Sequence, residues 1–188
     1  MPLSKSARDR AVSALFPIVV FAINAAICWR LFRTGYLDQL PSIEGAFIAL
    51  DRYILQHWPG YDWFPLWYGG FPFARTYQPL FHYSVAFLAA LSGLSVPSAY
   101  HTMAAIGYSL GGVAFYYLAR VLTGDRVAAF GGALVFSLFS PSALFLTAVR
   151  NDMGGLRNAR RLQAMVEYGE APNVTGLMLG MLALALLH

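Results

Sequence analysis

Two apolar runs in the middle of the chain constrain its fold more than any other feature. Residues 98–121 and 126–149 each reach the roughly 20 residues that an α-helix needs to cross the hydrocarbon core of a bilayer. The composition agrees, because 12% of the 188 residues are charged, whereas soluble domains carry about 25%. We therefore expect an all-α, polytopic integral membrane protein.

Two further apolar segments complete the predicted set of spans. Residues 11–32 follow Lys5, Arg8 and Arg10, which predicts a first transmembrane helix with a cytoplasmic N-terminus in a multi-pass protein of the cytoplasmic membrane. A cleaved signal peptide is the alternative, since it shares a basic start and an apolar core. Residues 173–188 begin another crossing and stop before its full length, so we expect the missing C-terminal part of the same protein as a partner.

The remaining segments predict helices outside the spans, within a single N-terminal module over 1–188. Residues 33–97 form a large external loop that holds helix 42–57, with Ser42 as its N-cap, and the apolar run 80–94. That run is short for a crossing, which favours a surface or re-entrant helix. Residues 155–167 predict a basic amphipathic helix that suits the phosphate groups of membrane lipid.

The external loop contains an unusual aromatic stretch, residues 62–83. Prolines interrupt it at three places, and Gly69 and Gly70 provide a turn without side chains. One interpretation is an interfacial belt of Trp and Tyr at the level of the lipid headgroups. The other is a lid whose aromatic walls enclose a polar substrate, and its candidate contacts are Trp63, Trp67, Tyr68 and Arg75.

Several classes of site are not predicted. The single cysteine, Cys28, excludes a disulfide framework and a cysteine-based metal site. The net charge of +4 is modest and the basic residues lie at segment ends, so nucleic acid is not an expected partner. His57, His82 and His101 show no metal-ligand spacing.

Three short segments resemble the motifs of membrane glycosyltransferases of the GT-C fold that use polyprenyl-phosphate donors. They are IEGAFIAL at 43–50, YQPLFHYSVAFLAALSGLS at 77–95 and AVRNDMGG at 148–155. The segments WYGGFPFARTYQPLFHY at 67–83 and RRLQAMVEYGEAPN at 160–173 look closer still to bacterial membrane proteins labelled 6-pyruvoyl-tetrahydropterin synthase-related. The resemblance implies a GT-C-like helical module that transfers a sugar from a lipid-linked donor at the outer face of the membrane.

Sugar transfer requires a carboxylate that takes the acceptor's proton and a cation that holds the departing phosphate. By its match to the family's acidic motif, Glu44 is the first candidate for the base, and Asp38 is the alternative. An acid in the first turn of a helix is also favoured by the helix dipole alone. Asp51 lies on nearly the same helical face as Glu44, but its neighbour Arg52 indicates an ordinary solvated surface.

Asp152 is the candidate second carboxylate, as a ligand for a divalent metal ion such as Mg²⁺ or Mn²⁺, or alternatively a helix cap. Arg157, Arg160 and Arg161 offer donors that suit the phosphate of the lipid-linked sugar donor. Arginine-rich loops are otherwise cytoplasmic anchors.

The side of the membrane on which Asp152 lies depends on the run 80–94. If that run spans the bilayer, Asp152 lies in the cytoplasm, opposite Glu44; if it lies on the surface, both acids lie outside. We expect the second topology, because the run is short. A non-enzymatic protein, either a transporter component or an assembly scaffold whose aromatic loop binds a ligand, is the alternative function.

Overall fold

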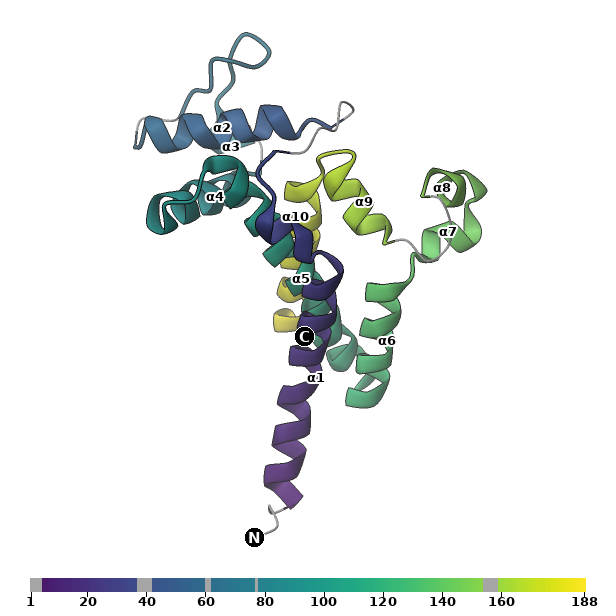
Figure 1. Cartoon of the computed structure of the whole chain (residues 1–188). Coiled ribbons are helices and arrows are strands. Elements are labelled where there is room, and N and C mark those ends of the chain that lie inside the picture. Colours follow the sequence, from purple (N-terminus) through teal and green to yellow (C-terminus); the bar gives the residue numbers. More distant parts are fainter. Residues whose placement is uncertain (1–4, 37–41, 60–61, 77, 154–158) are drawn as a thin grey trace. The chain divides into compact units, whose positions relative to one another are not determined.

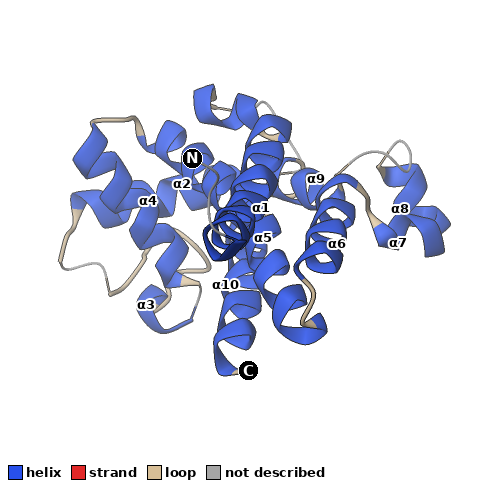
Figure 2. Cartoon of the chain, turned by 90° about the horizontal axis from the view of Figure 1, so that it is seen from below, coloured by secondary structure: helices blue, strands red, loops and turns tan. Residues whose placement is uncertain are grey.

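The structure, a computed structural model, describes residues 5–36, 42–59, 62–76, 78–153 and 159–188. Over these residues the chain is all-α, as the sequence predicts, with no strand (Figures 1 and 2). The only strand-like pairing in the described part is an isolated antiparallel bridge between Phe64 and Phe71.

The chain divides into two compact units. Unit 1 contains Met1–Cys28, Tyr108–Gln163 and Leu177–His188, and unit 2 contains Trp29–Gly107 and Ala164–Gly176. Each unit has its own core and is described by itself below.

Unit 1 is built from α1 (Lys5–Ile27), α6 (Arg126–Leu138) and the parts of α5 (Val96–Thr123) and α10 (Ala171–Leu187) that belong to it. Its buried residues include Val20, Ala114, Tyr116, Ala129 and Ala133. A Cβ atom on Gly112 of α5 would lie 2.5 Å from Asn24 Nδ2 of α1. Glycine therefore permits the close approach of these two helices.

The predicted span 126–149 is wrong in its length, because α6 ends at Leu138. Two short helices follow it, α7 (Pro141–Phe145) and α8 (Thr147–Asp152). Pro141 has no backbone N–H and pushes the preceding residue out of the helical region, and Ser140 is extended with φ −114° and ψ 93°. The apolar run therefore does not form one continuous helix, because it is interrupted at Pro141.

Unit 2 contains η1 (Trp29–Arg33), α2 (Glu44–Gln56), α3 (Phe73–Thr76), α4 (Pro79–Ser92) and the beginning of α5. Helix α2 packs on α4, and their shared core consists of Leu50, Ile54, Phe64, Phe73 and Ala86. Pro79 stands in the first turn of α4 and Gly93 ends it in the left-handed conformation, with φ 69°.

The aromatic stretch folds back on itself within unit 2. Phe64 and Phe71 exchange backbone hydrogen bonds of 3.0 Å, and Gly70 N donates to Trp67 O at 2.8 Å. Tyr68, Gly69 and Gly70 all have positive φ angles, of 53°, 74° and 102°. The predicted turn at the two glycines is therefore confirmed.

Two other predicted helices are confirmed with shifted ends. The helix expected at 42–57 is α2, and the helix expected at 80–94 is α4. The predicted N-cap is wrong by one residue, because Ile43 is the N-cap of α2 and no side chain caps the helix there. The Ser42 hydroxyl, one residue earlier, accepts a hydrogen bond from Glu44 N at 3.2 Å. The predicted helix 155–167 appears as α9 (Arg160–Val166), while residues 154–158 lie outside the described residues.

The helix lengths do not support a polytopic arrangement. Among the described residues, Val96–Thr123 is the one helix that is long and apolar enough to cross a membrane. The apolar parts of α1, α4, α6 and α10 are each shorter than the roughly 20 residues that a crossing requires. A buried core helix of a soluble protein can share the length and composition of α5, so this helix alone does not establish a membrane protein.

Candidate functional site

One face of α2 carries two buried carboxylates. Glu44 and Asp51 stand two helical turns apart, with Phe47 between them and Ile54 beyond, so that these side chains share a face. Asp51 is 0% exposed and Glu44 is 4% exposed. The expectation that Asp51 lies on a solvated surface is therefore wrong, because its position relative to Phe47 and Ile54 places it in the core.

Each carboxylate faces a buried histidine of a neighbouring helix. Asp51 Oδ1 lies 2.6 Å from His82 Nδ1 of α4, which is a hydrogen bond between fully buried groups. Glu44 Oε2 lies 3.0 Å from His101 Nε2 of α5, at the distance of an ion pair. Buried carboxylates require such partners, since an isolated charge in the interior is strongly unfavourable.

Burial raises the pKa of Asp51 in its pair with His82. Loss of solvation raises the pKa of the Asp51 carboxyl from 3.8 to about 6, against the opposing effects of the His82 hydrogen bond and charge. The Asp51 carboxyl therefore takes up a proton at a higher pH than an ordinary aspartate does.

The two pairs are connected by aromatic rings. The His82 ring lies 5.3 Å from Phe47 and 5.5 Å from Phe81, between ring centroids. Phe81 in turn contacts Tyr100, and Tyr100 contacts His101, at 5.4 and 5.5 Å. Ring contacts through Phe81 and Tyr100 thus link the two imidazoles.

Some polar atoms of this cluster have no hydrogen-bond partner among the described residues. They are Asp51 Oδ2 and His101 Nδ1, whereas His101 Nε2 faces Glu44 Oε2 in the contact just described. Most buried polar atoms in native proteins are hydrogen-bonded, and exceptions often mark sites that exchange protons or bind ligands. The cluster of Glu44, His101, Asp51 and His82 is our candidate site, and the name acid–histidine cluster is used for it below.

The aromatic loop has a buried half and an exposed half. Phe64 and Phe73 belong to the core of unit 2, and Trp67 packs against it, in T-shaped contact with Phe47. Trp63 and Tyr68 are exposed, and the Tyr68 ring stacks on Trp67 at 5.3 Å. The predicted substrate contacts thus separate into the half-buried Trp67 and two exposed residues, while Arg75 of α3 is exposed.

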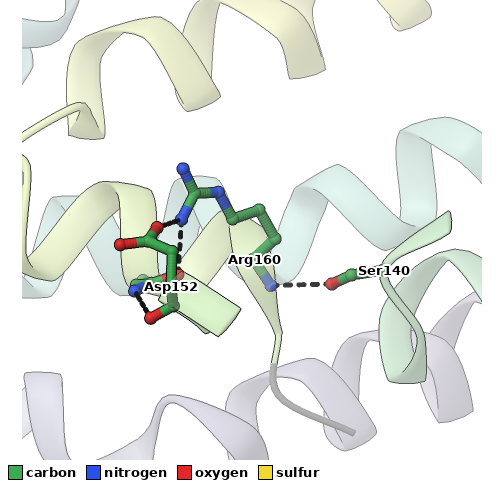
Figure 3. A network of polar contacts seen from close by, with 4 residues as sticks. Ser140, Asp152 and Arg160 are labelled. Atoms are coloured by element: carbon green, nitrogen blue, oxygen red, sulfur yellow. Dashed lines mark hydrogen bonds and ion pairs between the residues drawn. The ribbon is translucent and has the colours of Figure 1, made fainter. Parts of the chain in front are cut away.

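In unit 1, Asp152 is engaged by Arg160. The Asp152 carboxylate accepts from Arg160 Nη1 and the Asp152 carbonyl accepts from Gln163 Nε2, while Arg160 N donates to Ser140 Oγ at 2.8 Å (Figure 3). This network ties the end of α8 to the start of α9. The described residues include no group of three His, Cys, Asp or Glu side chains that could hold a metal ion. The arginine pairing does not match the donor set of a divalent cation.

Arg161 does not lie on a solvated basic face of α9. Its guanidinium lies 3.9 Å from the Phe136 ring centroid and 4.8 Å from that of Tyr108, and it donates to Phe136 O at 3.3 Å. The prediction of a basic face toward lipid is wrong for this residue, because cation–π contacts hold it among the helices of unit 1.

The other predicted residues are not brought together. Asp38 and Arg157 lie outside the described residues. Glu44 belongs to unit 2 and Asp152 to unit 1, so a site shared by these two acids stays a prediction. His82 and His101 were missed by sequence reasoning, although each is a polar residue within a strongly apolar segment, which is a signal for a buried partner.

Comparison with known proteins finds no match: no family model, no curated protein and no solved structure is similar to this chain. The resemblance to glycosyltransferases therefore stays a prediction carried by the short motifs.

Proposed function

We propose that the chain is a GT-C-like membrane glycosyltransferase that moves a sugar from a polyprenyl-phosphate donor at the outer face of the membrane. The observation that carries the proposal is the acid–histidine cluster, in which one helix presents two buried carboxylates to two imidazoles. Carboxylate–imidazole pairs are the groups that accept and hold protons at neutral pH.

In this proposal Glu44 accepts the proton of the acceptor hydroxyl as its oxygen attacks the anomeric carbon of the sugar. The bond between that carbon and the donor's phosphate oxygen breaks, and the phosphate leaves with the electron pair. His101, whose Nε2 lies 3.0 Å from Glu44 Oε2, positions the carboxylate. The pairing also stabilises whichever member carries the charge.

The membrane setting of the proposal has support of its own. Residues 76–119 contain no Asp, Glu, Lys or Arg. This stretch includes α4, whose exposed face carries Leu80, Phe87 and Leu91. An exposed apolar helix face without charge suits a lipid environment. The polytopic arrangement with spans near 11–32, 98–121 and 173–188 is part of this proposal.

The test is the rate of sugar transfer from a polyprenyl-phosphate-linked sugar by the variant Glu44→Gln in membranes. We expect a loss of about 10²- to 10⁴-fold, because the base is removed and the shape is kept. Asp62→Asn is the matched control, since it removes an exposed carboxylate of the same unit, and it should retain transfer.

A second candidate function is favoured by one observation in the aromatic loop. Tyr68 is 87% exposed and has φ 53°, an unfavourable backbone conformation for a bulky residue. Such strain on an exposed aromatic side chain fits a surface that binds a glycan or a partner without catalysis. Unchanged transfer in Glu44→Gln, together with lost glycan binding in Tyr68→Asn, would replace the transferase by this binding protein.

A further inference from the structure

An exposed surface of unit 2 combines arginines with aromatic side chains. It is formed by the short 3₁₀ helix η1 and by residues that contact its neighbourhood, and it is called the η1 surface below. Its members are all exposed, namely Trp29, Arg30, Phe32, Arg33, Tyr36 and Arg52. Leu31 of the same helix is buried. One side of η1 therefore belongs to the interior, and the other presents cations and aromatic rings.

The geometry of η1 places its two arginines side by side. Side chains three residues apart eclipse each other in a 3₁₀ helix, so Arg30 and Arg33 share one face. Both guanidinium groups approach the Trp29 ring, with the Cζ atom of Arg30 at 6.0 Å and that of Arg33 at 5.6 Å from its centroid. Arg52 Nη2 of α2 donates to Tyr36 Oη at 2.9 Å, which adds a third arginine to the η1 surface.

The positive charge of the η1 surface is not balanced by the described part of the chain. No carboxylate of the described residues forms an ion pair with Arg30, Arg33 or Arg52. Like charges on neighbouring side chains repel each other, and an anion that lies against both removes this repulsion. The η1 surface is therefore complementary to a layer of negative charge.

The aromatic rings favour lipid headgroups over an acidic protein as the source of that charge. Trp29 and Tyr36 each join an apolar ring to a polar group, and such side chains gather at the boundary between membrane and water. In the sequence, the η1 surface begins directly after the apolar residues Ser13–Ile27 of α1. Aromatic residues at the end of an apolar helix are typical of this boundary.

We propose that the η1 surface binds the headgroups of anionic phospholipids in the bilayer. Arg30, Arg33 and Arg52 supply the cations, and Trp29 and Tyr36 supply the rings that lie at headgroup level. Basic residues near an anionic membrane surface each strengthen its attraction for the protein. The inference goes beyond sugar transfer and does not depend on it, because the partner is the bulk phospholipid and not a sugar donor.

The experiment titrates the full chain, in micelles of a neutral detergent, with dihexanoyl-phosphatidylglycerol and, separately, with dihexanoyl-phosphatidylcholine. The two lipids share their acyl chains and differ in the net charge of the headgroup, and calorimetry measures their affinities. We expect phosphatidylglycerol to bind more tightly. Raising the ionic strength from about 0.1 M to about 1 M shortens the Debye length from about 10 Å to about 3 Å, so it should remove most of this preference.

Two matched double variants assign the preference to the η1 surface. Arg30→Gln combined with Arg33→Gln removes both charges from exposed positions and should weaken phosphatidylglycerol binding about tenfold or more. Its binding of phosphatidylcholine should change by less than about twofold. Arg30→Lys combined with Arg33→Lys keeps both charges, so it should bind phosphatidylglycerol within about threefold of the unchanged chain.

Three outcomes would overturn the proposal. The unchanged chain could bind both lipids equally, or the glutamine pair could bind phosphatidylglycerol as tightly as the lysine pair. In the third outcome, a polyglutamate peptide binds with a dependence on Arg30 and Arg33, while phosphatidylglycerol does not bind. That result would make the η1 surface an interface for an acidic protein.

Discussion

At the scale of single residues, the protonation of Asp51 makes the stability of the protein depend on pH. Below pH 3.8 the carboxyl is protonated in both the folded and the unfolded chain. As the pH rises from 3.8 to about 6, the Asp51 carboxyl ionises first in the unfolded chain. The free energy of unfolding therefore falls until this carboxyl is ionised in the folded chain as well. The neutral Asp51 carboxyl therefore stabilises the folded chain at acid pH, and this contribution disappears as the pH rises through about 6.

The variant Asp51→Asn tests this dependence. Asparagine keeps an oxygen that accepts a hydrogen bond from His82, and it cannot ionise. The free energy of unfolding of the variant, relative to that of the unchanged chain, should therefore rise between pH 4 and 6. The shift from 3.8 to about 6 corresponds to a gain of about 3 kcal/mol at most. Chemical unfolding at a series of pH values measures this gain. Parallel pH curves for the two proteins would show that Asp51 is not the group responsible.

The residue scale also shows what the sequence could predict about the site. Glu44 was identifiable by its motif, and the helical spacing from Phe47 to Asp51 and Ile54 was enough to place Asp51 on the buried face. The pairing of Asp51 with His82 and of Glu44 with His101 depends on how α2 meets α4 and α5. No local pattern encodes that packing, so the histidines could not be assigned to the acids.

At the scale of elements, the close approach of α1 and α5 depends on Gly112. A Cβ atom there would also lie 2.9 Å from Val20 Cγ1 and 3.0 Å from Ser137 Oγ. We expect Gly112→Ala to lower the free energy of unfolding by about 1–3 kcal/mol, because the helices must separate.

Gly131→Ala is the matched control for this prediction. Gly131 is also helical, and a Cβ atom there meets nothing within 4 Å, so alanine should be neutral or stabilising by up to about 1 kcal/mol. Thermal unfolding of both variants in detergent measures the difference. Equal effects of the two alanines would contradict the tight contact at Gly112.

Element boundaries were predictable where a residue imposes them. Pro79 stands in the first turn of α4 and Gly93 ends that helix, and both signals are local. Ser42 predicted the start of α2 to within one residue, since Ile43 is the N-cap. Pro141 carried the same kind of signal, but the apolar composition on both sides of it favoured one continuous span. The sequence predicts a belt or a lid for the aromatic stretch. Part of it instead supplies the core of unit 2, because Phe64 and Phe73 pack against Leu50, Ile54 and Ala86 of α2 and α4.

At the scale of the whole molecule, the proposed chemistry lies in the acid–histidine cluster of unit 2. The division into two units follows from contacts between distant segments, which single-sequence patterns do not record. The predicted partnership of Glu44 with Asp152 is replaced in the proposed mechanism by the observed partnership of Glu44 with His101.

The most direct measurement is a double-mutant cycle on the rate of sugar transfer by the full chain, with Glu44→Gln, His101→Gln and both together. If the two side chains act as one unit, the double variant should lose no more activity than Glu44→Gln alone. Independent losses that multiply in the double variant, or full transfer in all three, would contradict the account.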